Sequence, residues 1–339
     1  MTAASNGTTT HLALVGPTAS GKSAVALAAA ERLGDVEIVS VDSMQVYRGM
    51  DIGTAKPTPA EQAAVPHHLL DLVDPGEEFS VSQFQAAARE AVADIEARGR
   101  RALLVGGTGL YYQAVVDGFE LPGEDRELRA TLYERAGAPD GPAQLLAELV
   151  ELDPVAAGRI DPGNTRRIVR ALEVTMASGR PFSSYGPGVF GGGVPSGPAP
   201  AVTGEREGHG ETALRVAPAG LWMSRAVGAE RIEARIAAMV DDGLVDEVQR
   251  LAVAPGGLSR TAREGIGYKE VLDHLEGSVP TLEAALRRTA ERTRQLARRQ
   301  RMWFRRDRRI TWIGAGGNPL ATLPALLATW NVQSLLGDL

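Results

Sequence analysis

The chain has 339 residues, a formal net charge of −6, 44% hydrophobic residues and 23% charged residues, the composition of an ordinary globular protein. It contains no cysteine, which excludes disulfide bonds and thiolate metal sites, and its five histidines lack the spacing of a zinc site. No apolar run approaches the roughly 20 residues that span a bilayer. The N-terminal residues lack the basic and apolar regions of a signal peptide, so we expect a soluble, cytoplasmic protein.

The first predicted elements are a strand at residues 12–15, a glycine-rich turn and an alanine-rich helix. The turn has the sequence G-x-x-x-x-G-K-S, the P-loop pattern, in which backbone N–H groups surround a phosphate. Lys22 would supply a point charge, and the Ser23 hydroxyl is a candidate ligand of Mg²⁺. The candidate diphosphate-binding or nucleotide-binding residues are the eight residues of the pattern: Gly16, Pro17, Thr18, Ala19, Ser20, Gly21, Lys22 and Ser23.

Two more strands are predicted at residues 36–41 and 101–107, with a helix between them that begins at Ser80. Strands alternating with helices predict an α/β fold, a P-loop NTPase-like parallel sheet with helices on both faces. A ligand should then lie at the carboxyl ends of the strands. Asp42 follows the second strand, where a carboxylate is either a magnesium ligand or a general base.

The third strand ends in Gly106, Gly107 and Thr108 instead of an acid. The two glycines imply that something approaches the backbone closely, and Thr108 offers a hydroxyl at that point. For a glycine pair alone, a structural turn is the more usual explanation.

Beyond residue 116 the strand signal disappears, and short helical segments broken by Gly and Pro predict a helical insertion in the α/β core. Residues 186–210, in which 13 of 25 residues are Gly or Pro, predict a flexible loop without chemistry. A strand is expected at 213–218, and helices at 229–252 and 282–303. The predicted divisions are core residues 1–116, the inserted helical domain 117–182, the loop 183–212, the second part of the core 213–315 and a tail 316–339.

Residues 287–309 contain eleven arginines against Glu291 and Asp307, a local charge of +9 in an acidic chain. Such a stretch either binds a polyanion or forms a solvated helix face. Trp303 and Phe304 lie within this run, and aromatic residues in such a position are more often core residues than platforms for stacked bases.

Four stretches resemble the tRNA dimethylallyltransferases, also called the tRNA isopentenyltransferase or IPP transferase family. They are SVDSMQVYRGMDIGTAKP, VGGTGLYYQA, GIGYKE and TRQLARRQRMWFRR, which begin at residues 40, 105, 265 and 293. With the P-loop they occur in the family's order over roughly residues 12–312. The resemblance implies transfer of a dimethylallyl group from dimethylallyl diphosphate to the exocyclic N6 amine of the adenosine 3′ of the tRNA anticodon (position 37), releasing diphosphate.

The resemblance also implies roles for individual residues. Lys22 and the P-loop amides would hold the diphosphate, Arg231 would neutralise its growing charge, Asp42 would be the general base, and Thr108 would contact the target nucleotide. The implied tRNA-binding residues are Asp42, Ser43, Met44, Gln45, Thr108, Arg129, Arg166, Arg167, Ile168, Val169, Arg170, Gly265, Ile266, Gly267, Tyr268, Lys269 and Glu270. The expected cofactor is Mg²⁺, the expected partner is the anticodon stem-loop of tRNA, and we expect a monomer with no membrane partner.

Three alternatives remain open at this point. An isopentenyltransferase for free adenine nucleotides would share the fold, but it needs neither the insertion nor the basic stretch. A small-molecule kinase would place ATP in the P-loop, with Asp42 as metal ligand or base. An RNA-binding protein without turnover would need no catalytic carboxylate. The arginines at 166, 167 and 170 would, without the resemblance, be read as a solvated helix face.

Overall fold

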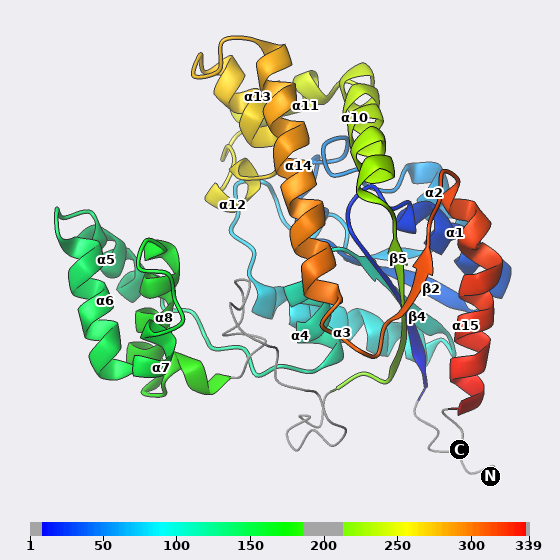
Figure 1. The fold of residues 1–339 in the computed structure, drawn as a ribbon, viewed down its shortest axis with the longest axis horizontal. Helices are drawn as coiled ribbons and strands as arrows, with labels where there is room; N and C mark the ends of the chain where they lie inside the picture. The colour runs from blue at the N-terminus through cyan, green and yellow to red at the C-terminus, as the bar shows by residue number, and fades with distance from the viewer. Residues whose placement is uncertain (1–8, 186–212, 337–339) are drawn as a thin grey trace. The chain divides into compact units, whose positions relative to one another are not determined.

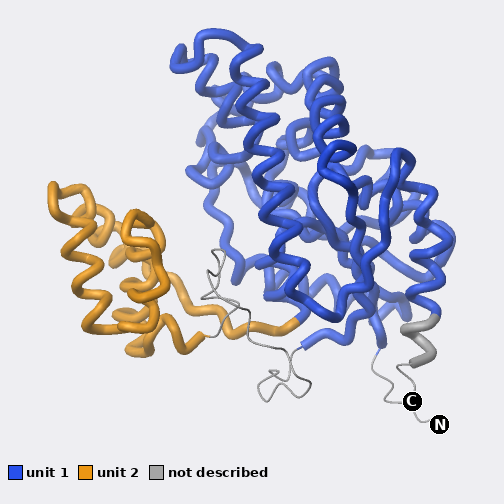
Figure 2. Tube along the Cα trace, viewed as in Figure 1, with its two compact units in different colours: residues 1–116, 213–339 blue, residues 117–212 orange. Residues whose placement is uncertain are grey.

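The computed structural model describes residues 9–185 and 213–336, so the predicted loop at 186–210 lies outside the described residues. The chain forms two compact units (Figure 2). Unit 1 comprises Met1–Val116 and Ala213–Leu339, and unit 2 comprises Asp117–Thr212.

Unit 1 is built on one parallel sheet of six strands in the order β3-β2-β4-β1-β5-β6 (Figure 1). Its central strands are short apolar runs that are buried on both faces, the usual pattern of a parallel sheet covered by helices. The strands are β1 (His11–Val15), β2 (Val36–Val41), β3 (His67–His68), β4 (Arg101–Gly106), β5 (Val216–Trp222) and β6 (Thr311–Gly314). The predicted α/β class with a parallel sheet is confirmed.

Alternate residues of β1 point to opposite faces of the sheet, and each face has its own core. Leu12 and Leu14 pack in the cluster that includes α1 (Lys22–Leu33) and α15 (Leu323–Leu336). Ala13 and Val15 pack in the opposite cluster, which includes α3 (Val81–Ala97) and α4 (Gly109–Val116).

Residues 316–339 were predicted as a C-terminal tail, and the structure describes this segment as far as residue 336. The short 3₁₀ turn η2 (Pro319–Thr322) and α15 belong to unit 1, and α15 buries Leu326 and Trp330 in the sheet's core. This apolar surface would otherwise face water, which is why the segment folds onto the sheet.

Other boundaries also differ from expectation. The single helix expected at 229–252 is two helices, α10 (Arg225–Asp241) and α11 (Leu244–Val253), because the chain turns at Gly243 with a φ of 100°. The strand expected at 213–218 begins at Val216 and ends at Trp222. The remaining helices of unit 1 are α2 (Pro59–Ala64), α12 (Arg260–Arg263), α13 (Tyr268–Leu275) and α14 (Leu282–Phe304).

The described part of unit 2 is helical and has a core of its own. Its elements are α5 (Arg126–Ala136), α6 (Gly141–Leu152), α7 (Pro154–Ala157), α8 (Thr165–Ser178) and η1 (Phe182–Tyr185). Leu132, Leu145, Leu149 and Leu172 fill the space between these helices. Across both units, none of the described helices has the length and apolar character needed to cross a bilayer.

Candidate active site

The glycine-rich loop, residues 16–23, joins β1 to α1 at the carboxyl edge of the sheet. Gly21 precedes α1 in a left-handed conformation with a φ of 82°, and Ala19 also has a positive φ of 63°. No side chain caps the start of α1, so its first N–H groups are left for an anion. The predicted strand–turn–helix arrangement is therefore present in the structure.

Three cations lie at this loop: its own Lys22, and Arg231 and Arg235 of α10. Arg235 Nη1 donates to Thr18 Oγ1 at 3.2 Å, and Arg231 lies against Gly21. Desolvation by burial and the charge of Arg235 lower the pKa of Lys22 to about 8, although the Asp42 carboxylate opposes the shift. Desolvation also lowers the pKa of both Arg231 and Arg235.

Two polar groups at this loop are buried without a partner among the described residues, Arg231 Nη1 and Ser20 Oγ. An unpaired buried donor costs free energy, so such groups mark a place where another molecule completes the hydrogen bonding. Because one of them belongs to a cation, the arrangement attracts an anion. Sequence reasoning had singled out Arg231 but had missed Arg235.

Asp42 and Thr108 follow neighbouring strands, and a hydrogen-bonded turn brings them together. Asp42 Oδ1 accepts a hydrogen bond from Met44 N at 2.9 Å, and Thr108 Oγ1 accepts one from Ser43 N at 3.3 Å. No hydrogen bond reaches Asp42 Oδ2 from the described residues, so this oxygen is available to accept a proton. The Asp42 carboxylate also lies close enough to Lys22 and Arg235 to raise the pKa of each, against the lowering by desolvation.

The glycines at the end of β4 and just after it are in close contact with other parts of the protein. A Cβ on Gly106 would collide with Val41 O, and one on Gly107 would collide with Gln300 Nε2. A Cβ on Gly109 would meet the Trp303 ring in the same way. Phe304 is buried and meets the Tyr112 ring edge-on, with centroids 5.7 Å apart. These aromatic residues of α14 are therefore packing residues.

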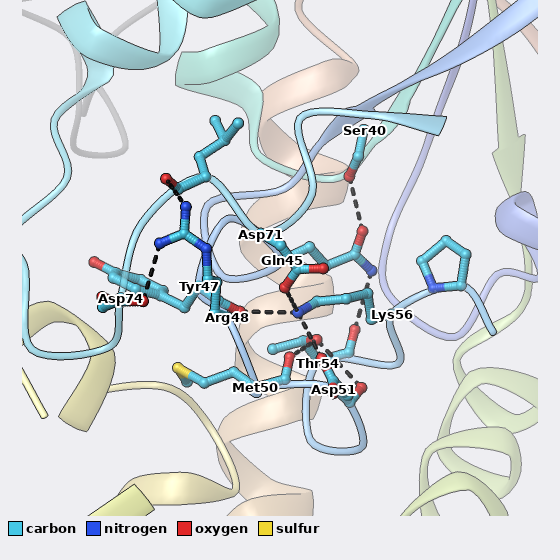
Figure 3. Close-up of polar contacts among 12 residues, drawn as sticks. Ser40, Gln45, Tyr47, Arg48, Met50, Asp51, Thr54, Lys56, Asp71 and Asp74 are labelled. Carbon is cyan, nitrogen blue, oxygen red and sulfur yellow. Dashed lines mark hydrogen bonds and ion pairs between the residues drawn. The ribbon is translucent and has the colours of Figure 1, made fainter. Parts of the chain in front are cut away.

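The segment that follows Asp42 is held by an internal polar network (Figure 3). Gln45 Oε1 accepts from Ser40 Oγ at 2.8 Å, and Gln45 Nε2 donates to Thr54 O and Ala55 O. The Gln45 side chain, implied as a tRNA contact, is thus buried and engaged. Lys56 Nζ donates to Tyr47 O at 2.8 Å, Asp51 Oδ1 at 2.6 Å and Asp71 Oδ1 at 2.5 Å.

The family-like stretch at 265–270 is joined to the same segment through Glu247 of α11. Glu247 accepts three backbone N–H groups of residues 51–53, at 2.9 to 3.1 Å, and the Tyr268 hydroxyl at 2.5 Å. Burial and the Glu247 charge raise the pKa of Tyr268. Glu270 accepts from Gly267 N and from Arg292 of α14.

The side chains of this stretch therefore differ in what they can reach. Tyr268 and Glu270 are buried, as are Gly265 and Gly267, whereas Ile266 and Lys269 are half-buried. Lys269 pairs with Glu264 at 2.9 Å. Ile266 and Lys269 are thus the two residues of this stretch with partly exposed side chains.

In unit 2 most of the implied tRNA contacts are engaged within the unit itself. Arg129 and Arg170 both donate to the fully buried Glu173, with the three distances between 2.8 and 2.9 Å. Ile168 and Val169 lie in the unit's core. Arg166 is exposed and Arg167 is half-buried.

The arginine-rich stretch falls on α14 and the residues just after it. Some of its arginines form ion pairs, including Arg287, Arg292, Arg294 and Arg309. Seven others form none within the residues described: Arg288, Arg298, Arg299, Arg301, Arg305, Arg306 and Arg308. Uncompensated cations of this kind favour a polyanion over a self-contained salt-bridge network.

A parallel sheet of this order, with a glycine-rich loop, three cations that form no ion pair with the described residues and a carboxylate at its carboxyl edge, is consistent with a P-loop-like α/β protein. A family model described as IPP transferase matches residues 45–307, and one described as isopentenyl transferase matches residues 9–71. The chain belongs to the IPP transferase family.

Individual relatives match this chain over nearly its whole length. A tRNA dimethylallyltransferase from Pseudarthrobacter chlorophenolicus is 47% identical over 307 residues, which cover 91% of this chain and 94% of that protein. The crystal structure of a tRNA isopentenylpyrophosphate transferase from Bacillus halodurans is 35% identical, with a TM-score of 0.66, and the match covers 97% of this chain and 99% of that one. A related structure from Staphylococcus epidermidis is 30% identical, with a TM-score of 0.64 and coverage of 96% and 100%.

Proposed function

We propose that this enzyme transfers the dimethylallyl group of dimethylallyl diphosphate to N6 of the adenosine 3′ of the tRNA anticodon (position 37). The bond from C1 of the prenyl group to the diphosphate oxygen breaks, and a bond from C1 to N6 forms. The amine proton passes to a carboxylate, and diphosphate leaves with the electron pair. The observation that carries the proposal is a set of three cations at the glycine-rich loop, Lys22, Arg231 and Arg235, which form no ion pair with the described residues and lie beside the free oxygen of Asp42.

The donor half of the site is residues 16–23 with Arg231 and Arg235. Lys22, the two arginines and the start of α1 would share the charge that develops on the leaving diphosphate. Ser23 has an exposed side chain at the start of α1, and among the described residues no group of three or more His, Asp or Glu side chains could hold a metal ion. These residues fit a Mg²⁺ ion held by Ser23 and diphosphate oxygens, which would add charge neutralisation.

The acceptor half is Asp42 with the turn that Thr108 holds. An exocyclic amine conjugated to a purine ring is a weak nucleophile, so a carboxylate must help remove its proton during attack. The adenosine would leave its stack in the anticodon loop to reach Asp42. The unpaired arginines of α14, and Arg166 in unit 2, would bind RNA phosphates.

The relatives named as tRNA dimethylallyltransferases support tRNA as the acceptor, and an enzyme for free adenine nucleotides would not need those arginines. We therefore propose a cytoplasmic enzyme, active as a monomer, that uses tRNA in preference to a free nucleotide. ATP would act at most as a competitor for the glycine-rich loop.

The test is a mass-spectrometric digest of unmodified tRNA after incubation with the protein, Mg²⁺ and dimethylallyl diphosphate. We expect a five-carbon addition on the adenosine 3′ of the anticodon and none on AMP in a parallel reaction. Prenylated AMP without prenylated tRNA would establish the free-nucleotide alternative. ATP consumption without a prenylated product would contradict the proposal.

The carboxylate is tested separately. Asp42→Asn should lower the transfer rate by about two to four orders of magnitude, because it removes a general base, and should leave tRNA binding largely intact. Asp241→Asn is the matched control, since Asp241 is exposed at the end of α10. A rate of Asp42→Asn equal to that of the control would remove Asp42 from the chemistry.

A further inference from the structure

Gln300 of α14 lies where the donor loop and the acceptor turn meet. Its side-chain Oε1 accepts a hydrogen bond from the backbone N–H of Thr18 at 2.7 Å. Its Nε2 packs so closely on Gly107 that any larger residue there would collide with it. Thr18 belongs to the glycine-rich loop, and Gly107 precedes Thr108, so a single side chain contacts both halves of the site.

The neighbours of Gln300 along α14 are uncompensated cations. Arg298 and Arg299 are exposed and Arg301 is half-buried, and no side-chain ion pair or hydrogen bond holds them within residues 9–185 and 213–336. All four residues belong to one continuous helix of 23 residues. Because backbone hydrogen bonds hold such a helix as a unit, a phosphate that fixes these arginines also fixes the position of Gln300.

The Thr18 amide matters for the donor. Its N–H donates to Gln300, so the diphosphate is left to the later amides of the glycine-rich loop. That hydrogen bond fixes the backbone at the beginning of the loop, four residues before Lys22. Anything that holds Gln300 in place therefore holds the loop in one conformation.

We propose that Gln300 is a positioning residue that couples the RNA site on α14 to the diphosphate site on the glycine-rich loop. The inference rests on the proposed function and names a regulatory link within it. RNA bound at Arg298, Arg299 and Arg301 fixes the Gln300–Thr18 hydrogen bond and tightens diphosphate binding. Because coupling between two sites is reciprocal, diphosphate tightens RNA binding by the same factor.

The size of the effect follows from the bond that transmits it. A net hydrogen-bond contribution corresponds to about a threefold to tenfold change in an equilibrium constant. The coupling between RNA and diphosphate should have this size in the wild-type protein and should disappear when the acceptor atom is removed.

The experiment is calorimetric titration of the full chain with inorganic diphosphate and Mg²⁺, alone and with a saturating anticodon stem-loop RNA. In the wild type, RNA should lower the diphosphate Kd by about threefold to tenfold. Gln300→Met keeps the length of the side chain but lacks the acceptor, and should show no dependence on RNA. Gln295→Met is the matched control, because Gln295 lies on the same helix with an exposed side chain.

A second variant guards against a folding defect. Gln300→Asn keeps an amide but shortens the side chain by one methylene, so it should also lose the coupling while the thermal unfolding midpoint stays close to that of Gln295→Met. A wild type that binds both ligands without coupling would overturn the inference and leave the proposed function standing. Full coupling in Gln300→Met and in Gln300→Asn would overturn it equally. A wild type that binds neither ligand would overturn the proposed function as well.

Discussion

Two lysines of unit 1 show opposite ways of placing a charge within a protein. Lys56, whose side chain is 2% exposed, donates to one carbonyl and two carboxylates at 2.5 to 2.8 Å (Figure 3). Lys22 has one hydrogen bond to the described residues, a 3.4 Å contact with Pro17 O. Desolvation by burial lowers its pKa, and its cationic neighbour Arg235 lowers that pKa further. The first lysine is fully compensated within the fold, whereas the second is left for a ligand.

The same contrast extends to the segments that carry them. Around Lys56, residues Ala55, Leu69 and Asp71 all adopt a positive φ, a conformation that non-glycine residues rarely adopt. The polar network holds this strained path and so fixes the backbone that follows Asp42. Around Lys22, polar atoms of Ser20 and Arg231 have no partner in the described part of the chain. The polar groups around Lys56 are satisfied within the fold and fix the shape of the site. Those around Lys22 are left to bind a ligand.

The largest expected effect comes from Lys22. Lys22→Met should lower the rate of prenyl transfer by about two to three orders of magnitude, because it removes a charge that stabilises the leaving diphosphate. Thermal stability should stay the same or rise, since the desolvated cation has one long hydrogen bond and no ion pair with the described residues. Single-turnover assays and thermal unfolding of the same preparations check both parts. A large loss of stability would mean that Lys22 is structural.

Lys56→Met should give the reverse result. We expect a loss of about 1 to 3 kcal/mol in the free energy of unfolding, because a buried carbonyl and two carboxylates lose their donor. The cost stays in this range because Asp51 and Asp71 are themselves partly exposed, at 57% and 43%. Urea denaturation measures it, with Lys269→Met as control for a partly exposed pair worth about 0.5 kcal/mol. Equal losses in the two variants would contradict the role given to Lys56.

The comparison also explains what could be read from the sequence. The glycine-rich loop, the central strands and Asp42 follow from local patterns, in which residue type and spacing dictate the chemistry. Lys56 and Glu247 give no such signal, because a buried charge is recognised only when its partners are known. Some of those partners are far along the chain, as with Glu247 and the amides of residues 51–53.

The short strands β3 and β6 were not predicted from the sequence for a related reason. Strand β3 has two residues and β6 has four, too few for a period to be recognised, and each is defined by the strand beside it. Gln300 contacts Thr18 across 282 positions, so only the fold brings the two together. The burial of Tyr268 and Glu270 was equally unforeseen, since the family-like stretch carries no information about which side chains point inward.

The pH dependence of diphosphate binding tests whether Lys22, unlike Lys56, is left to bind a ligand. A bound anion favours the protonated form of Lys22 and raises its pKa above the value of about 8 that the free site has. Diphosphate affinity should therefore be constant with respect to this group below pH 8. It should fall as the pH rises through 8, by at most about tenfold per pH unit for one proton. Calorimetric titration from pH 7 to pH 9.5 measures this, and Lys22→Arg should flatten the curve because arginine stays protonated.

The smallest effect is expected at Glu247, which joins the segment of Lys56 to the stretch at 265–270. Tyr268→Phe removes one of four donors to Glu247 and leaves the ring in place, so the free energy of unfolding should fall by only about 1 kcal/mol. Because Tyr268 is 1% exposed, its hydroxyl lies inside the fold, and the affinity for an anticodon stem-loop should stay within about twofold of wild type. Lys269 is the next residue of α13 and its side chain is half-buried, so Lys269→Ala should weaken RNA binding more than Tyr268→Phe does. Filter binding at two salt concentrations compares the variants. A loss of RNA affinity confined to Tyr268→Phe, with unchanged stability, would mean that Tyr268 becomes exposed and contacts RNA in the complex. Its side chain would then be buried only in the free enzyme.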